Sequence, residues 1–379
     1  MSLKYTESIS HLFVFLEIFS QEGGIQSYIK ELLKAYISAG LGKAEVFLLR
    51  DCSGCGNPFE GEGSPLKFYY LKTSPPWLGR LRMAITLFQS LQKHRPQRVF
   101  CGHVKLAPLV NLLCQFFKVP YTVLTYGKEV WEPLSPLYRK ALQEAESIWT
   151  IGRYTRDRAC TSNNLAPQKF QLLPCTVDGT VFTPGPKPQA LINRYNLAGY
   201  RVLMTVARLW SGDMYKGVDV TIRALPHIAQ KIPNVKYLVI GRGSDRPRLQ
   251  KLAADLGVAE RVVFAGFVPK EELPEHYRVA DAYVMPSQEG FGIVYLEAMA
   301  CGIPVLAGDN DGSAEPLEDG RLGWRVPHRD VNAVATACVE ILQGGDQRCN
   351  GAWLRQEVLK RFGTDSFTER LKQLVCPNF

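Results

Sequence analysis

Short apolar runs alternate with amphipathic helical segments along almost the whole chain. Continuous apolar runs separated by helices are typical of strands that are buried on both faces of a parallel sheet. The apolar runs span residues 12–16, 44–49, 98–101, 121–125, 147–151, 201–206, 235–240, 261–264, 282–285 and 304–306. The helical patterns include residues 25–37, 78–93, 218–230 and 247–256. The alternation predicts an α/β protein made of strand–helix–strand units.

A proline-rich segment interrupts this alternation. Three prolines within residues 182–188 exclude a regular helix, and the chain of 379 residues is long enough for two domains. We therefore expect an N-terminal domain at 1–183 and a C-terminal domain at 184–363, with a helix at about 364–379 packing back on the first. Both would be Rossmann-like, doubly wound parallel sheets that face each other across a cleft, with ligands beyond the carboxyl ends of the strands.

Charge and composition narrow the class of protein. Hydrophobic residues make up 46% and charged residues 21%, which excludes a disordered or collagenous chain. The longest apolar run, 106–117, is too short to span a bilayer. The net charge is +9, and no Asp or Glu occurs between Glu62 and Glu129. A basic face of this kind indicates an anionic partner, namely a phosphate, a nucleic acid or a lipid surface.

The cysteines and the N-terminal residues suggest a cytoplasmic protein. The ten cysteines are scattered, and most lie in apolar runs, as buried thiols do in a reducing compartment. No small-residue cleavage site follows the first apolar run, so we expect no signal peptide. Cys52 and Cys55 have metal-ligand spacing, but no second pair or nearby histidine completes a zinc site, so a loop is the favoured interpretation.

The most informative segment is residues 286–305. A strand is predicted to end near Met285, Gly290 and Gly292 permit a tight turn, and a helix is predicted to begin near Ile293. Because the first N–H groups of a helix have no partner within the helix, such a start forms an anion site.

Two carboxylates accompany this turn. Glu289 lies on it, and Glu297 lies one turn into an otherwise apolar helix, where its side chain can point back to the same site. A buried carboxylate is costly unless something bonds it, and the hydroxyls of a sugar or ribose would do so. The alternative is a glutamate that is satisfied by the backbone or by an arginine.

Glu289 and Glu297, followed by Ala-Met-Ala-Cys-Gly-Ile-Pro-Val, resemble the signature of the family-4 (group 1) retaining glycosyltransferases. The resemblance covers nearly the whole chain, and its C-terminal motifs are the more specific ones. It implies the GT-B fold, with two facing Rossmann-like domains, and a nucleotide sugar bound by the C-terminal domain.

The resemblance also implies roles for residues elsewhere in the C-terminal half. Arg208 and Lys216 match the basic pair that grips the donor diphosphate, where two cations would stabilise the charge that grows on the leaving group. Surface solubility is the alternative for these two. Gly241 and Gly243 match a loop beside the nucleotide, and Val268 stands where backbone groups meet the base.

In the N-terminal half the motifs are looser. Gly23 and Gly24 resemble the family's glycine loop near the donor phosphates and acceptor, although a plain strand-to-helix turn explains them equally well. His103 follows a predicted strand and is either catalytic or merely packed. Many relatives carry a histidine where Tyr126 stands, so the role of that histidine in contacting sugar is not carried over. Tyr126 or Glu129 is still expected to line the cleft.

The predicted site therefore has two sets of residues. Glu289, Arg208, Lys216 and His103 are the predicted catalytic residues. The predicted substrate-binding residues are Gly23, Gly24, Gly241, Gly243, Val268, Gly290, Phe291, Gly292, Ile293, Glu297, Tyr126 and Glu129.

The resemblance implies a metal-independent, retaining transferase that moves a sugar from a UDP- or GDP-sugar to a hydroxyl of a growing polysaccharide or lipid-linked glycan. No cofactor is expected, because Arg208, Lys216 and the helix start would replace a metal. A catalytically silent, nucleotide-sugar-binding scaffold subunit is the alternative, and the intact site residues argue against it. A nucleic-acid partner is not expected, because the basic stretch has no regularly spaced aromatic residues and no nucleic-acid motif.

The predicted helix at 78–93 combines apolar residues with Arg80, Arg82 and Lys93. A basic amphipathic helix can lie on an anionic membrane, which a lipid-linked acceptor would also require. The alternative is a helix that packs its apolar side on the N-terminal sheet, and both can hold. The expected location is cytoplasmic and peripheral, on the inner face of the membrane.

Overall fold

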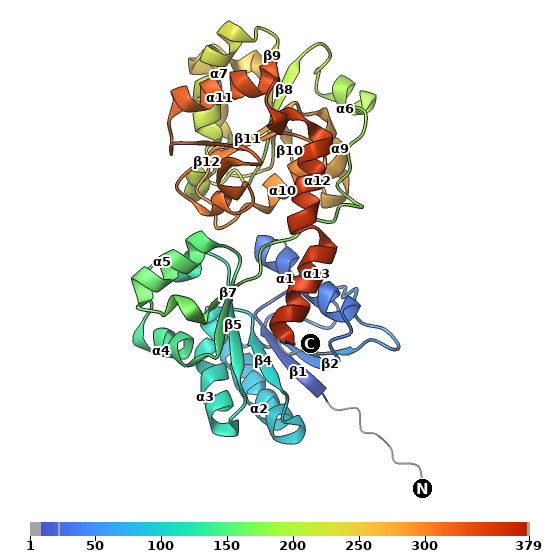
Figure 1. The fold of residues 1–379 in the computed structure, drawn as a ribbon, viewed down its shortest axis with the longest axis vertical. Helices are drawn as coiled ribbons and strands as arrows, with labels where there is room; N and C mark the ends of the chain where they lie inside the picture. The colour runs from blue at the N-terminus through green and yellow to red at the C-terminus, as the bar shows by residue number, and fades with distance from the viewer. Residues whose placement is uncertain (1–8, 22, 377–379) are drawn as a thin grey trace. The chain divides into compact units, whose positions relative to one another are not determined.

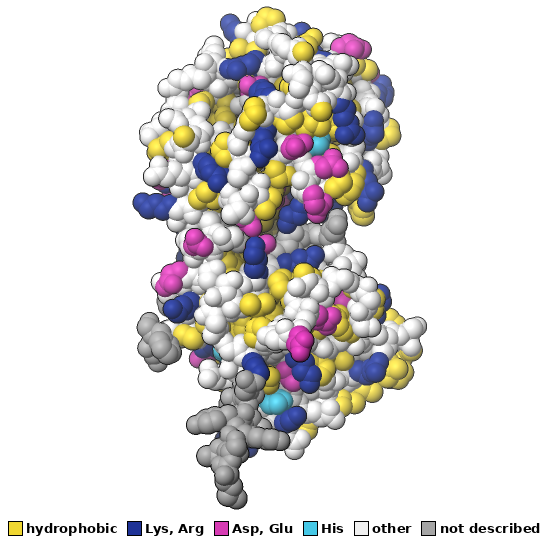
Figure 2. Space-filling model, turned by 90° about the vertical axis from the view of Figure 1, so that its right-hand side faces the viewer, with side chains coloured by type: hydrophobic (Ala, Val, Ile, Leu, Met, Phe, Trp, Pro, Cys, Tyr) yellow, Lys and Arg dark blue, Asp and Glu magenta, His cyan; other side chains and the backbone are white. Residues whose placement is uncertain are grey.

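The computed structural model describes residues 9–21 and 23–376, which fold into two compact units (Figure 1 and Figure 2). One unit comprises the described residues up to Cys175 together with those from Phe367 onward, and the other is Thr176–Ser366. Each is built around its own parallel sheet, so the two Rossmann-like, doubly wound domains of the prediction are confirmed.

The first unit has a seven-stranded sheet in the order β3-β2-β1-β4-β5-β6-β7. Its strands are β1 (Ile9–Phe15), β2 (Lys43–Leu48), β3 (Leu66–Tyr70), β4 (Arg98–Cys101), β5 (Tyr121–Thr125), β6 (Ser147–Thr150) and β7 (Phe170–Leu172). Its helices are α1 (Gly24–Ser38), α2 (Pro76–His94), α3 (Ala107–Phe117), α4 (Pro136–Glu144), α5 (Arg153–Asn163) and most of α13 (Thr364–Val375). Every neighbouring pair is parallel.

The second unit has a six-stranded sheet in the order β10-β9-β8-β11-β12-β13, and its neighbouring strands are again parallel. Its strands are β8 (Arg201–Val206), β9 (Val235–Ile240), β10 (Val262–Gly266), β11 (Ala282–Met285), β12 (Val305–Gly308) and β13 (Trp324–Val326). Its helices are α6 (Gln189–Arg194), α7 (Val218–Lys231), α8 (Arg246–Asp255), α9 (Leu273–Val279), α10 (Ile293–Ala300), α11 (Val331–Gln343) and α12 (Gly351–Phe362).

The central strands are buried on both faces, which is why they read as unbroken apolar runs. In the first sheet the rings of Phe13 and Phe100 stack with their centroids 4.9 Å apart. In both sheets the strand order reverses beside the first strand of the unit, at the β1–β4 and β8–β11 pairs. Loops at the carboxyl ends of strands near such a reversal are where these sheets bind ligands.

Helix α13 packs on the first unit. The ring of Phe367 lies edge-on to that of Tyr28, with 5.9 Å between centroids. The guanidinium of Arg370 donates to the carbonyl oxygen of Leu172 at 3.2 Å, and that of Arg98 donates to Leu374 at 3.4 Å. Residues 377–379 of the predicted C-terminal helix lie outside the described residues. Among the residues that are described, no helix is long and apolar enough to cross a membrane.

Candidate functional site

Three loops meet at the carboxyl ends of β8, β9 and β10. The amide of Gly241 donates to the carbonyl oxygen of Gly266 at 2.7 Å, which joins the ends of β9 and β10. A Cβ on Gly241 would lie 1.8 Å from the oxygen of Ala207, and one on Gly243 would lie 2.1 Å from that of Leu209. Both positions therefore need glycine so that the β9 loop can approach the β8 loop.

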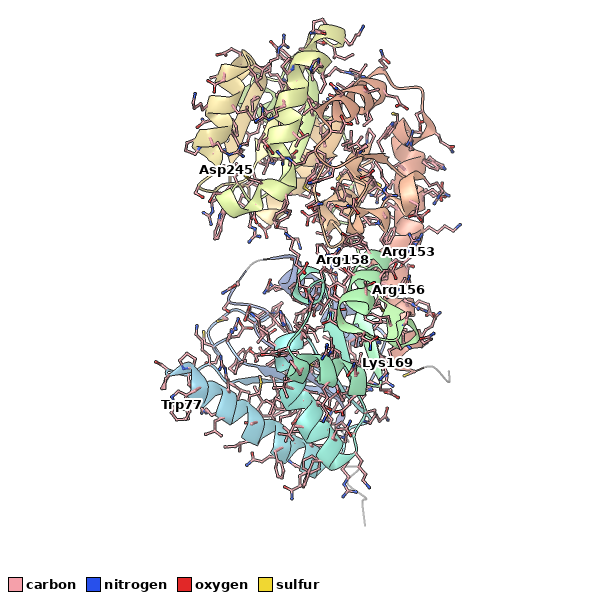
Figure 3. All side chains as sticks on the ribbon, turned by 90° about the vertical axis from the view of Figure 1, so that its left-hand side faces the viewer. Trp77, Arg153, Arg156, Arg158, Lys169 and Asp245 are labelled. Carbon is pink, nitrogen blue, oxygen red and sulfur yellow. The ribbon has the colours of Figure 1, made fainter. Side chains whose placement is uncertain are left out.

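The β8 loop places a cation in this region. The Nε of Arg208 lies 3.2 Å from Oδ2 of Asp213, which belongs to the short 3-10 segment η4 (Ser211–Lys216). The side chain of Arg208 is 64% exposed, so its guanidinium is accessible from solvent. Arg208, Trp210, Asp213, Lys216, Asp245 and Arg248 are among the residues that line a small pocket, and Figure 3 labels Asp245 at the start of α8.

Lys216 ends η4 and forms an ion pair with Oε1 of Glu289. Burial alone would lower the pKa of Lys216, but the charge and hydrogen bond of Glu289, together with Tyr215 and Asp213, outweigh it and raise this pKa. Lys216 is therefore a fixed, fully charged cation at neutral pH. The carbonyl oxygen of Tyr215 accepts a hydrogen bond from the amide of Gln288 at 3.0 Å, which ties η4 to the loop after β11.

Asp311 holds the backbone of that loop. Its Oδ2 accepts from the amide of Glu289 at 2.7 Å, and its Oδ1 accepts from the amide of Ser313 at 2.9 Å. The amide of Gly312 in turn donates to the carbonyl oxygen of Glu289 at 2.7 Å. Burial raises the pKa of Asp311 to about 6, although the hydrogen bonds from Glu289 and Ser313 act to lower it. Sequence reasoning missed Asp311, although its place soon after the end of β12 was a signal for it.

The turn between β11 and α10 has the predicted form. Gly292 has φ 90° and precedes Ile293, which is the first residue of α10, and no side chain caps this helix start. Gly290 is partly exposed. The ring of Phe291 is buried and lies edge-on to Phe362 at 6.0 Å, so this side chain anchors the loop in the core. Only the backbone of Phe291 can serve a ligand.

Glu297 lies in the second turn of α10 and is buried. Its Oε2 accepts a hydrogen bond from the hydroxyl of Tyr277 at 2.7 Å, and burial raises its pKa to about 7. Within the described residues Oε1 has no hydrogen-bond partner in the structure. Tyr277, on α9, is a partner that the sequence could not reveal, because it lies on a different helix. The carboxyl group of Glu297 is therefore half satisfied by the fold.

This pKa gives a prediction about stability. A folded-state pKa raised from 4.5 to about 7 means that the folded protein binds the proton more tightly than the unfolded chain. The stabilising contribution of protonated Glu297 is therefore fully present below pH 4.5 and is lost as the pH rises through about 7. We expect the unfolding free energy of the ligand-free protein to decline relative to that of Glu297→Gln across this interval. Denaturant titrations of both proteins at several pH values test this, and parallel pH profiles would contradict it.

The glycine loop of the first unit is organised by Asp51. Helix α1 begins at Gly24, and the carbonyl oxygen of Gly23 accepts from the amide of Ser27 at 2.9 Å. Ahead of these glycines, the carboxylate of Asp51 accepts from the amides of residues 18, 19 and 20 at 2.6–3.1 Å. Asp51 follows β2 closely, and the sequence analysis did not single it out.

His103 caps the 3-10 segment η1 (Val104–Leu106). Its Nδ1 accepts from the amide of Lys105 at 3.1 Å. Burial, together with the charges of Lys105 and Arg50, lowers the pKa of His103 to about 4. The ring is therefore neutral at pH 7, and because Nδ1 accepts, its proton is on Nε2. His103 has a structural role here, and its Nε2–H is still a hydrogen-bond donor.

Tyr126 and Glu129 follow β5. The hydroxyl of Tyr126 donates to the carbonyl oxygen of Gly102 at 2.9 Å, and its ring is buried. The carboxylate of Glu129 accepts from the amides of Tyr126 and Gly127, and burial raises its pKa. Both polar groups are thus used to shape the loop. Val268, in the second unit, is buried two residues beyond β10.

Comparison with known proteins agrees with this geometry. Residues 200–344, most of the second unit, match the family described as "Glycosyl transferases group 1". The chain is 33% identical over 265 residues to the GDP-mannose-dependent alpha-(1-6)-phosphatidylinositol monomannoside mannosyltransferase of Mycobacterium tuberculosis, covering 66% of this chain and 68% of that protein. The chain belongs to the group 1 glycosyltransferases.

The protein of the same name from Mycolicibacterium smegmatis is 38% identical over 231 residues, covering 58% of this chain and 59% of the relative. The match thus spans less than two thirds of that relative's length. Among solved structures, Anabaena HepE in complex with UDP has a TM-score of 0.79 at 19% identity, covering 97% of this chain and all of that one. Sucrose-phosphate synthase from Thermosynechococcus elongatus has a TM-score of 0.77 at 22% identity, covering 97% and 98%. These likenesses establish the GT-B fold.

Proposed function

We propose that this protein transfers a sugar from a nucleotide sugar to a hydroxyl of a growing glycan, with retention of configuration. The observation that carries the proposal is the contact between Lys216 and Glu289 beside the start of α10. It unites a fixed cation, a carboxylate and free helix N–H groups within one loop cluster. A diphosphate and a sugar need these groups side by side.

The diphosphate is assigned to the two cations. Arg208 and Lys216 are held by Asp213 and Glu289 in the ligand-free site, so each is positioned before any ligand arrives. The more exposed guanidinium of Arg208 can leave Asp213 for a phosphate oxygen without crossing the core. The N–H groups at the start of α10, near Gly290 and Ile293, supply further positive potential.

The sugar and the nucleoside are assigned to the carboxylates and loops. Glu289 accepts from hydroxyls of the donor sugar, and the open Oε1 of Glu297 accepts from the ribose. Gly241 and Gly243 bring backbone close to the nucleotide, and backbone groups around Val268 meet the base. A buried carboxylate with a raised pKa binds hydroxyls best once it is ionised, so donor affinity should rise with pH towards about 7.

Retention requires attack on the face that the leaving group occupies. The bond from the anomeric carbon to the phosphate oxygen breaks, and the bond to the acceptor oxygen forms on the same side. The acceptor proton passes to an oxygen of the leaving diphosphate, so that no protein base is needed. We assign to the neutral His103 the donation of its Nε2–H to a hydroxyl of a substrate bound at the first unit.

GDP-mannose is the donor to test first, and a glycolipid is the acceptor class. The two relatives named above are described as GDP-mannose-dependent and as acting on a phosphatidylinositol mannoside. UDP remains the competing base, because it is the nucleotide bound in HepE. The test is to measure the melting temperature with each UDP- and GDP-sugar in turn, and we expect one of them to raise it. Release of the nucleotide excludes a catalytically silent scaffold subunit.

We also propose that transfer needs no metal ion, since Arg208 and Lys216 neutralise the leaving diphosphate. Transfer should therefore survive EDTA at full rate. The measurement is sugar transfer before and after chelation, with added Mg²⁺ or Mn²⁺ as the control. Loss of transfer on chelation and its recovery with either ion would overturn this account of the leaving group.

A further inference from the structure

Helix α2 has two apolar faces. Its inward face contributes Met83, Leu87 and Leu91 to the core of the first unit. The sequence analysis expected the helix to dock in this way, to face a membrane, or to do both. The structure shows that the docked helix still has large apolar side chains left over on its outer side.

These outer side chains form one continuous strip, the α2–α3 ridge. Trp77, Leu81, Ile85 and Phe88 recur at intervals of three or four residues, so they lie along one side of the helix. Leu112 and Phe116 repeat the same spacing on α3, and the rings of Phe88 and Phe116 are 6.1 Å apart. Exposed fractions along the ridge run from 37% at Phe88 to 70% at Phe116.

Basic side chains flank the ridge. Because successive helical residues turn by about 100°, Arg80 lies on one side of the apolar strip, and Arg82 and Lys93 lie on the other. All three are exposed. The whole segment between Glu62 and Glu129, which includes α2, α3 and their connection, contains no acidic residue.

From this combination we infer that the α2–α3 ridge docks on an anionic membrane. The inference rests on the proposed function in one respect, since a glycolipid acceptor requires the enzyme at a bilayer. Apolar side chains enter the boundary between headgroups and acyl chains, and the flanking cations bind anionic headgroups. Figure 3 shows Trp77 at the end of α2, directed away from the unit, and tryptophan favours that boundary.

The charge of the ridge favours an anionic membrane over a second copy of this chain as its partner. A surface for a second copy of this chain would place like charges opposite one another, since the ridge carries cations on both flanks and no carboxylate within its segment. A membrane with anionic lipid accommodates both the apolar strip and its flanking cations, and it does not require a complementary protein surface.

The test is sedimentation of the full chain with two kinds of vesicle, phosphatidylcholine alone and equal parts of phosphatidylcholine and phosphatidylglycerol. We expect binding to the anionic vesicles only. Leu81→Ser combined with Ile85→Ser, and separately Arg80→Glu combined with Arg82→Glu, should each lower the bound-to-free ratio by about tenfold or more. The matched controls are on α4: Leu137→Ser, also an exposed leucine, and Arg139→Glu with Lys140→Glu, the same charge change.

A second measurement reports insertion directly. Phosphatidylcholine with brominated acyl chains quenches tryptophan that reaches the acyl region, and we expect mixed anionic vesicles containing it to quench the wild type. Trp77→Phe should lose most of this quenching while still sedimenting with vesicles. Quenching that is unchanged in Trp77→Phe would overturn insertion of the ridge.

The outcomes separate this inference from the proposed function. Absence of vesicle binding, or equal binding by the ridge variants and their α4 controls, overturns the docking surface even if a nucleotide sugar still raises the melting temperature. Vesicle binding by a protein whose melting temperature no nucleotide sugar changes would support membrane docking by the ridge and contradict the proposed function. A loss of self-association in Leu81→Ser with Ile85→Ser would identify the ridge as a contact between copies and overturn its assignment to lipid.

Discussion

Lys216→Ala should lower the rate of sugar transfer by about two decades or more. Of the two cations assigned to the diphosphate, Lys216 is the more enclosed, since its side chain is 17% exposed against 64% for Arg208, and it is paired with Glu289. Removing one preorganised electrostatic contact to a leaving group costs about 3–4 kcal/mol of transition-state stabilisation. The affinity for the nucleoside diphosphate product should fall as well. Steady-state transfer and a nucleotide titration measure the two effects.

The matched control for this variant is Lys231→Ala, which removes an exposed lysine at the end of α7 in the same unit. Its transfer rate should equal that of the wild type. Circular dichroism and melting show whether either variant has lost its fold. A Lys216→Ala enzyme that folds and transfers within threefold of wild type would remove Lys216 from the diphosphate site.

The central strands and the start of α10 could be predicted from the sequence, because buried strands and helix starts leave recognisable patterns of neighbouring residues. β4, β5, β8, β9 and β11 begin and end at the predicted residues, and each is a central strand with a neighbour on both sides. The start of α10 at Ile293 was predicted from two glycines between an apolar strand and an apolar helix. Such signals need only the neighbouring residues.

Of the four edge strands in the described residues, β3, β7 and β13 were not predicted, whereas β10 was predicted at 261–264. β3, β7 and β13 end their sheets or are short, and their sequences mix apolar with polar residues, as in Leu66-Lys-Phe-Tyr-Tyr70 and Trp324-Arg-Val326. A strand that pairs on one side alone and borders solvent loses the continuous apolar run that marks a central strand.

The supporting residues of the site were also out of reach. Asp213, Asp311 and Tyr277 hold Arg208, the Glu289 amide and Glu297 respectively, and each is an ordinary residue in its own segment. The roles of Asp311 and Tyr277 arise only when separate elements of the fold come into contact. The role of Asp213 depends on the path of the short loop that joins it to Arg208. The two faces of α2 are a similar case, because helical periodicity shows where apolar residues lie but not which side the sheet covers.

Glu289→Gln should separate catalysis from nucleotide binding, in contrast to Lys216→Ala. Glutamine keeps the size of the side chain and an oxygen that can accept from Lys216, but it removes the negative charge. The ammonium of Lys216 then has no carboxylate competing for it, so a nucleoside diphosphate should bind at least as tightly as it binds the wild type. The carboxylate that accepts from the donor sugar is lost, so turnover should fall by about two decades.

Glu271→Gln is the matched control for this change, since Glu271 is exposed on the 3-10 segment η6 (Lys270–Glu272) of the same unit. Transfer rates with saturating donor give turnover, and calorimetry with UDP and GDP gives the nucleotide affinity. Reduced nucleotide affinity in Glu289→Gln would mean that Glu289 acts mainly by holding Lys216 in place. Unchanged turnover would mean that it does not meet the sugar. Reduced turnover with retained nucleotide affinity would assign Glu289 to the donor sugar and Lys216 to the diphosphate. In that case Lys216→Ala loses nucleotide affinity whereas Glu289→Gln keeps it, although the two residues form one ion pair.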